Sequence, residues 1–174
     1  MSAPTAPSPD LSGTARPATW SRAQIVLHWV VALLVLAQYL FNGPIVEAWN
    51  ALGRGMEISP DPLVMGHVFG GIAILLLVIW RLRLRAVRPA PAPLGDRPVL
   101  HRVAALTHAA LYGVLALLVL SGGMAWFVGF GPAAGVHGAL RAVLLLLILL
   151  HVVGALWHAF VLRDGTMRRI TRAE

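Results

Sequence analysis

Residues 136–163 read VHGALRAVLLLLILLHVVGALWHAFVLR, an almost uninterrupted apolar run that contains His137, His151 and His158. A helix crosses a hydrocarbon core of about 30 Å with about 20 apolar residues. Backbone groups in lipid must be hydrogen-bonded within the segment, which favours a helix over an open strand. The run therefore predicts a membrane-spanning helix at about residues 138–162.

Three further apolar segments precede this one, at about residues 25–41, 63–80 and 103–121. The connections between them are rich in glycine and proline, which interrupt helices. The sequence therefore predicts an all-α integral membrane protein, a four-helix transmembrane bundle formed by residues 20–174. Residues 1–19 are rich in Pro, Ser, Thr and Ala, and we expect them to form a disordered N-terminal tail.

The composition agrees with a membrane protein and excludes several other classes. Of the 174 residues, 58% are hydrophobic and 12% are charged, whereas soluble domains have about 45–50% and about 25%. The absence of cysteine excludes disulfides, iron–sulfur clusters, thiol catalysis and covalent c-type haem. The net charge of +7 is carried by arginines that lie between the apolar runs, so we predict no nucleic-acid partner.

The arginines predict the orientation of the chain. The connection between the first and second helices has only Arg54, against three acidic residues, and the last connection has no arginine. Cytoplasmic connections carry the excess of basic residues. Both termini and the second connection are therefore predicted to be cytoplasmic. The basic residues on that side are Arg16, Arg22, Arg81, Arg83, Arg85, Arg88, Arg97, Arg102, Arg163, Arg168, Arg169 and Arg172.

The histidines within the apolar segments fall at two depths. His137 and His151 are 14 residues apart, which places them about 21 Å apart on nearly the same face of one helix. The predicted topology puts His28 near the cytoplasmic side and His67 near the outer side. His28 can thus meet His151 at an inner level, while His67 can meet His137 at an outer level.

Two facing histidine pairs in a bundle core are the arrangement that two bis-histidine haems require. We therefore predict an inner haem b held by His28 and His151, and an outer haem b held by His67 and His137. These four histidines are then the axial ligands of the haem irons. His108 lies at a depth similar to His28 and is an alternative ligand, or else a core polar partner of Tyr112.

Other polar residues near these levels have two interpretations each. Arg141 follows His137 by one turn and either contacts a haem propionate or another anion, or extends to the membrane interface. Arg22 and Arg102 are candidates for inner propionates. His158 either contacts a quinone or supports a haem ligand, or is an interfacial residue without a specific role.

Five segments of the chain resemble the bacterial cytochrome b561 family, which is also grouped with the cytochrome b subunits of nickel–iron hydrogenases. The resemblance covers residues 20–171 and is most specific in the last helix. It implies a four-helix, multi-pass protein of the bacterial plasma (inner) membrane with two b-type haems and the same ligand pairs. It also implies electron transfer between a donor and the quinone pool. The segments are SRAQIVLHW (21–29), HVFGG (67–71), LTHAALY (106–112), VHG (136–138) and LHVVGALWHAFVLRDG (150–165).

These features favour transmembrane electron transfer from an outer donor to a quinone. The resemblance includes members similar to a superoxide oxidase, which passes electrons from superoxide to ubiquinone. The alternative within the same class is a membrane-anchor cytochrome b subunit of a hydrogenase or dehydrogenase. Outside redox chemistry, a histidine-based metal transporter is a further alternative, although we find no inverted repeat and no carboxylate in the spans. A third alternative is a haem chaperone or a haem-sensing membrane module.

Overall fold

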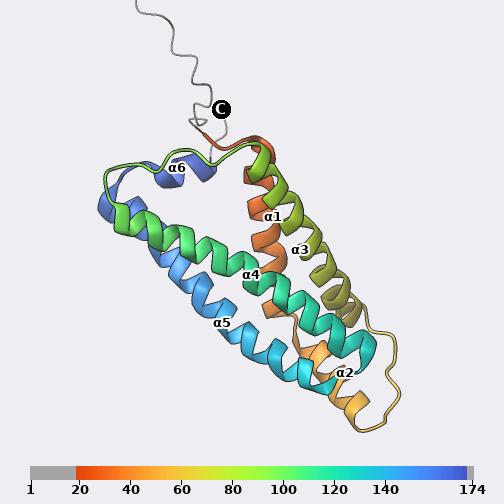
Figure 1. Cartoon of the computed structure of the whole chain (residues 1–174). Helices are drawn as coiled ribbons and strands as arrows, with labels where there is room; N and C mark the ends of the chain where they lie inside the picture. Colours follow the sequence, from red (N-terminus) through yellow and green to blue (C-terminus); the bar gives the residue numbers. More distant parts are fainter. Residues whose placement is uncertain (1–18, 172–174) are drawn as a thin grey trace, which may run out of the picture.

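The computed structural model describes residues 19–171, and these fold into helices without a strand. The predicted four-helix membrane architecture is confirmed, because four helices are long and apolar enough to span a bilayer. The predicted tail, residues 1–19, lies outside the described residues except for Thr19. The helices are α1 (Arg22–Leu40), α2 (Gly43–Gly53), α3 (Pro62–Val87), α4 (Pro98–Val128), α5 (Gly131–Leu156), the π-helical η1 (Trp157–Leu162) and α6 (Thr166–Thr171) (Figure 1).

The spanning helices form two packed pairs. Helix α1 lies beside α3, while α4 and α5 form a long antiparallel hairpin that contacts α3 through α4 (Figure 1). All four helices contribute to one apolar core, in which every side chain is at least 92% buried. This core lies midway along the helices and holds the two pairs together. Its members are Val35, Ile74, Val78, Leu118 and Leu144.

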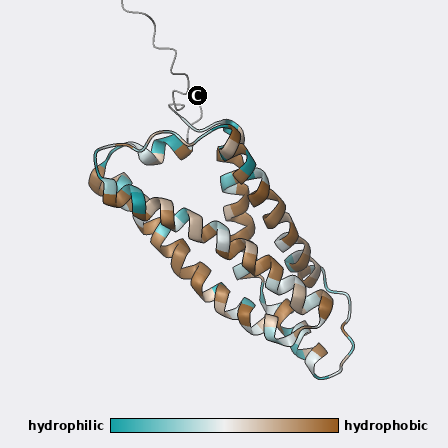
Figure 2. Ribbon diagram, viewed as in Figure 1, coloured by the Kyte–Doolittle hydropathy of each residue, from teal (hydrophilic) through white to brown (hydrophobic). Residues whose placement is uncertain are grey.

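The outer faces of the bundle are apolar. Leu33 of α1 and Leu146 of α5 are 64% and 66% exposed, and many other large apolar side chains also point outward. Figure 2 shows hydrophobic residues along the lengths of the helices, with hydrophilic residues gathered mainly at their ends and in the connections. A continuous apolar surface of this size matches lipid rather than water as the surrounding solvent.

The helices extend beyond the segments that hydropathy alone predicts. Helix α3 continues to Val87, and α4 begins at Pro98. In both helices the added turns contain polar residues, which a search for apolar runs leaves out. Proline suits the first position of α4, where the N–H has no helical partner. Helix α4 ends at Val128 and is capped by Gly129, whose φ of 73° favours glycine. The short helices α2 and α6 were not predicted, since neither contains a long apolar run.

One end of the bundle gathers the start of α1, the connection 88–97 and α6. The Trp29 Nε1 donates to the Ile170 carbonyl over 3.2 Å, and the Arg169 Nη1 donates to the Ala92 carbonyl over 2.7 Å. We call this the arginine-rich end, and the opposite one, which carries α2 and the connection to α5, the α2 end. The arginine-rich segments that the sequence assigned to one side thus meet at one end, while the side of the membrane that each end faces stays a prediction.

Candidate functional site

A seven-residue spacing places histidines and core residues on the inward faces of three helices. Seven residues make nearly two turns, so positions seven apart share a face of the helix. On α5, this spacing joins His137, Leu144 and His151. The same spacing on α1 and α3 joins His28 with Val35 and His67 with Ile74. Each helix thus carries histidines on the face that carries the buried apolar core.

The structure brings both predicted histidine pairs together. Towards the arginine-rich end, the rings of His28 and His151 face each other with centroids 6.1 Å apart. Towards the α2 end, the rings of His67 and His137 have centroids 6.3 Å apart. All four side chains are half-buried between the helices. The two-level arrangement expected from the sequence is therefore present in the fold.

The two separations match those of imidazoles on opposite sides of one metal ion. Metal–nitrogen distances of about 2.0–2.1 Å on each side put the two ring centroids about 6.3 Å apart. His108 also lies near His151, but their centroids are only 5.0 Å apart and their planes are 79° apart. The predicted pairs also meet edge-on, with planes 65° and 64° apart, so the separation of the centroids and not the angle distinguishes them. The residues present thus fit a bis-histidine group better as His28–His151 than as His108–His151.

Hydrogen bonds orient the His137 ring. Its Nδ1 lies 2.9 Å from the Leu118 carbonyl oxygen, which can accept a hydrogen bond only from a protonated Nδ1. The neutral ring then carries its lone pair on Nε2, the form that binds a metal. In His67, Nδ1 is buried and has no hydrogen-bond partner within residues 19–171. A buried polar atom of this kind usually has a partner, so the His67 ring lacks the orienting hydrogen bond that the His137 ring has.

His67 and His137 line an apolar cavity together with Gly122, and Gly70 lies beside it on α3. A Cβ atom at Gly122 would lie 3.0 Å from Nδ1 and Cε1 of His137. A Cβ atom at Gly70 would lie 2.6 Å from the Gln38 Nε2, which donates to the His67 carbonyl over 3.0 Å. These two glycines therefore leave room for the side chains that set the positions of the histidines.

Arg141 lines the same cavity and is exposed. Its carbonyl oxygen accepts a 2.6 Å hydrogen bond from the Tyr39 hydroxyl, which connects α1 with α5. The predicted place of Arg141, one turn from His137, brings its cation to the edge of the cavity. Contact with a propionate or another anion stays a prediction.

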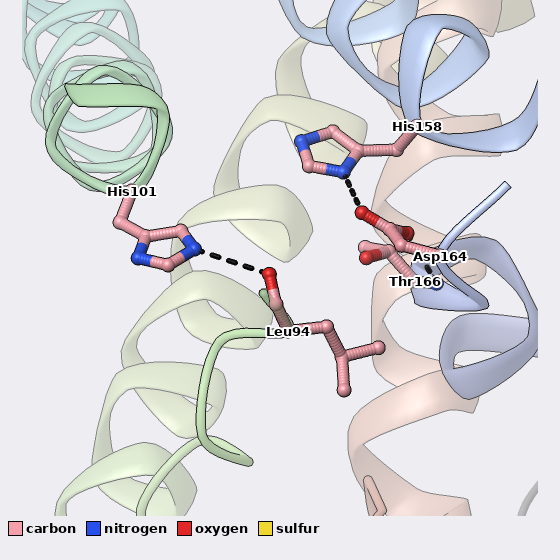
Figure 3. A network of polar contacts seen from close by, with 5 residues as sticks. All are labelled: Leu94, His101, His158, Asp164 and Thr166. Atoms are coloured by element: carbon pink, nitrogen blue, oxygen red, sulfur yellow. Dashed lines mark hydrogen bonds and ion pairs between the residues drawn. The ribbon is translucent and has the colours of Figure 1, made fainter. Parts of the chain in front are cut away.

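His158 lies at the arginine-rich end, where η1 replaces the α-helical pattern of α5. Its Nδ1 lies 2.6 Å from the Asp164 Oδ2, and the Thr166 amide donates to the Asp164 Oδ1 over 3.0 Å (Figure 3). The connection to Asp164 turns at Arg163, whose φ is 50°. The sequence did not predict this ion pair, because Asp164 lies beyond the last span.

The pKa of the Asp164 carboxyl is lowered. Partial burial raises this pKa, but the hydrogen bonds from Thr166 and the contact with His158 outweigh burial and lower it to about 2. Since the folded-state pKa lies below the usual 3.8, the ionised form stabilises the fold above that value. This contribution is lost only as the pH falls towards 2. The carboxylate is therefore available to His158 throughout the physiological range.

Arg81 is a site residue that the sequence pattern marked only as a topology signal. Its Nε donates to the Tyr112 hydroxyl over 2.8 Å, and its Nη1 donates to the Gln24 carbonyl over 3.1 Å. Arg22 and Arg102, which were the candidates for this level, are exposed. The signal that identifies Arg81 is its spacing, because it follows His67 by 14 residues on the same helix.

Comparisons with known proteins agree with this geometry. Residues 19–173 match the family model described as prokaryotic cytochrome b561. The chain is 38% identical over 157 residues to cytochrome b562 of Cereibacter sphaeroides, with 88% of this chain and 95% of the relative covered. It is 31% identical over 178 residues to a probable superoxide oxidase CybB of Yersinia pestis, with 87% and 94% covered.

Proposed function

The chain belongs to the prokaryotic cytochrome b561 family, and from this premise we propose that it binds two haems b and transfers electrons across the membrane to a quinone. Membership implies haem b as the cofactor. The observation that carries the rest is the presence of two facing histidine pairs, with centroids 6.1 Å and 6.3 Å apart, at two levels of one bundle. A single haem would leave one pair without a role.

His28 and His151 hold the haem nearer the arginine-rich end, and His67 and His137 hold the other. When bound, each haem supplies a ferric–ferrous couple that carries one electron. With two histidines holding it, each iron would have no open position for a small molecule. Electrons therefore enter and leave at the edges of the two sites.

The protein holds its two ligand levels apart and keeps water away between them. His137 and His151 are about 21 Å apart along α5, within a hydrocarbon core of about 30 Å. The apolar layer of Val35, Ile74 and Leu144 lies between the levels and is almost fully buried. The helices that provide the ligands also provide this layer, so the ligand geometry and the core are set by the same packing.

The α2 end faces outward and the arginine-rich end faces the cytoplasm, in the bacterial inner membrane. The basic segments that meet at one end support this orientation through the positive-inside rule. The exposed Arg141 then stands at the outer edge of the cavity around His67 and His137. Its charge attracts an anionic donor such as superoxide, and the similarity to a probable superoxide oxidase supports that donor.

A quinone accepts the electrons at the arginine-rich end, where His158 supplies a proton. Two superoxide ions give up two electrons and become two molecules of dioxygen, and the quinone takes these electrons with two protons from the cytoplasm to become a quinol. Asp164 holds the Nδ1 of His158 at 2.6 Å. The other ring nitrogen, Nε2, is then the atom that exchanges protons with the quinone oxygen.

The direct test mixes the purified oxidised protein with superoxide and an ubiquinone analogue and follows haem reduction and quinol formation together. We expect superoxide to reduce the haem within the mixing experiment and quinol to appear with a ratio of about two electrons per quinone. Reduction by dithionite but not by superoxide would contradict this donor. It would favour the alternative, a subunit that receives electrons from a partner dehydrogenase or hydrogenase.

Replacing Arg141 with glutamine is expected to slow haem reduction by superoxide about tenfold at low salt, because electrostatic attraction of the anion is lost. The difference from the wild type should shrink as the ionic strength rises. Arg54→Gln at the exposed end of α2 is the matched control and should change the rate little. An Arg141→Gln rate equal to that of the wild type at low salt would contradict the steering role.

Replacing His158 with glutamine is expected to slow quinone reduction by about 100-fold, since a positioned acid–base group contributes about 10²–10⁴-fold. The rate of haem reduction by the donor and the haem content should stay unchanged. His101→Gln is the matched control, because His101 lies at the same end and its Nε2 lies 3.3 Å from a backbone carbonyl, that of Leu94, rather than from a carboxylate (Figure 3). Equal effects of both variants would contradict a specific role of His158.

A further inference from the structure

Helix α3 brings a fixed positive charge to the level of His28 and His151. Arg81 follows His67 by 14 residues, which places it on nearly the same face and about 21 Å nearer the arginine-rich end. The relation repeats that of His137 and His151 on α5. Each of the spanning helices that the structure describes therefore has a histidine or an arginine at the level of the His28–His151 pair. These residues are His28, Arg81, His108 and His151.

Two hydrogen bonds fix the guanidinium of Arg81 between three helices. Its Nε donates to the Tyr112 hydroxyl of α4 at 2.8 Å, and its Nη1 donates to the Gln24 carbonyl of α1 at 3.1 Å. Gln24 is only 3% exposed and stands one turn before His28. The guanidinium is thus held inside the bundle, just on the arginine-rich side of the histidine pair.

No protein carboxylate balances this charge in the part of the chain that the structure describes. The one ion pair of residues 19–171 joins His158 with Asp164. The Tyr112 hydroxyl and the Gln24 carbonyl are neutral partners, and they use two of the five N–H donors of a guanidinium. A charge inside a membrane protein is costly without a counter-charge and marks a functional site. The arrangement calls for an anion beside Arg81.

We infer that Arg81 binds a propionate carboxylate of the haem held by His28 and His151. This inference rests on the proposed function, which supplies that haem. Haem b carries two propionates on one edge, and a guanidinium binds a carboxylate through two parallel hydrogen bonds. The hydrogen bond with Tyr112 keeps the guanidinium in place for this contact.

The positive charge of Arg81 affects the direction of electron transfer. Reduction adds a negative charge to the haem, and a fixed cation nearby favours that state. Arg81 is partly buried, whereas Arg141 beside the other pair is exposed and more strongly screened by solvent. Arg81 therefore makes the haem nearer the quinone the better electron acceptor of the two.

The test is an equilibrium redox titration of the purified holoprotein in nonionic detergent, followed in the haem absorption bands. In Arg81→Gln, the reduction equilibrium constant of one haem should fall on the order of tenfold, which is about 59 mV for a one-electron couple. The affected component should be the one that a His151→Ala variant lacks. Arg83→Gln, which removes the same charge from an exposed site two residues away, should leave both components unchanged.

Two further variants separate charge from structure. Arg81→Lys keeps the positive charge, so its reduction potentials should stay close to those of the wild type. Tyr112→Phe keeps Arg81 but removes the hydrogen bond that holds it, so the potential of the same haem should fall by less than in Arg81→Gln. If Arg81→Gln loses its haem, the inference is tested with these two variants instead. Arg81→Gln with full haem content and wild-type potentials would overturn the inference. So would wild-type potentials in Tyr112→Phe with full haem content.

The source of the anion is tested by reconstituting the apoprotein with haem dimethyl ester, whose propionates carry no charge. If Arg81 binds a propionate, the difference between the wild type and Arg81→Gln should become much smaller with the ester. If the difference persists with the ester but disappears after removal of phospholipid, the anion is a lipid phosphate and the inference is wrong. Absence of haem from the wild type itself would instead contradict the proposed function.

Discussion

Replacing His151 with alanine is expected to remove the haem nearer the arginine-rich end and leave the other one in place. The haem content should fall from about two to about one per chain, because His28 loses the ring that faces it at 6.1 Å. The His67–His137 pair is about 21 Å away along the helix and shares no contact with the altered site. Pyridine haemochrome analysis measures the content, and a redox titration should lose one of its two components.

His108→Ala is the matched control for this variant, since it removes another imidazole from the same level. Its ring centroid is 5.0 Å from that of His151, and its Nδ1 bonds to the Ala104 carbonyl of its own helix at 2.6 Å. We expect this variant to retain both haems. Loss of a haem from His108→Ala, with full content in His28→Ala, would reassign the ligand pair to His108 and His151.

Replacing Gly122 with leucine is expected to remove the haem nearer the α2 end. A Cβ atom at Gly122 would already lie 3.0 Å from the His137 ring, so a leucine side chain displaces that ring from the Leu118 carbonyl. The ring then loses both its place opposite His67 and the hydrogen bond that orients it. Haem content should fall from about two to about one per chain, with the remaining component sensitive to His151→Ala.

Gly135→Leu serves as the control for size and hydrophobicity. Gly135 stands two residues before His137 on α5 and is exposed, and a Cβ atom at this position would meet no neighbouring atom within 4 Å. This variant should keep both haems and the wild-type spectrum. Full haem content in Gly122→Leu would mean that the His137 ring has room to move and still bind, which contradicts the close fit at this position.

The architecture was predictable because lipid imposes simple rules on a sequence. Each spanning helix needs an apolar run of sufficient length, and all four runs are visible in the hydropathy of the chain. The facing of His28 with His151 and of His67 with His137 followed from helical periodicity and alternating direction alone. The fold brings these rings together, whereas their role as ligands stays a prediction.

The parts that sequence reasoning missed depend on contacts between distant segments. Asp164 lies in a tight turn after η1, and only the left-handed conformation of Arg163 brings it back to His158. Arg81 was grouped with the arginines of the following connection, although its spacing from His67 sets it apart. The start of α2 at Gly43 was hidden because short helices give no long hydrophobic pattern.

Two histidine pairs that each hold a haem are the basis of the proposed electron transfer. The measurement that tests them most directly is the reduced-minus-oxidised absorption spectrum of the purified protein, combined with haem and protein quantification. We predict a b-type spectrum with about two haems per chain. One haem per chain in the wild type would contradict the two-site arrangement, and a protein that binds another metal but no haem would contradict the proposed function altogether.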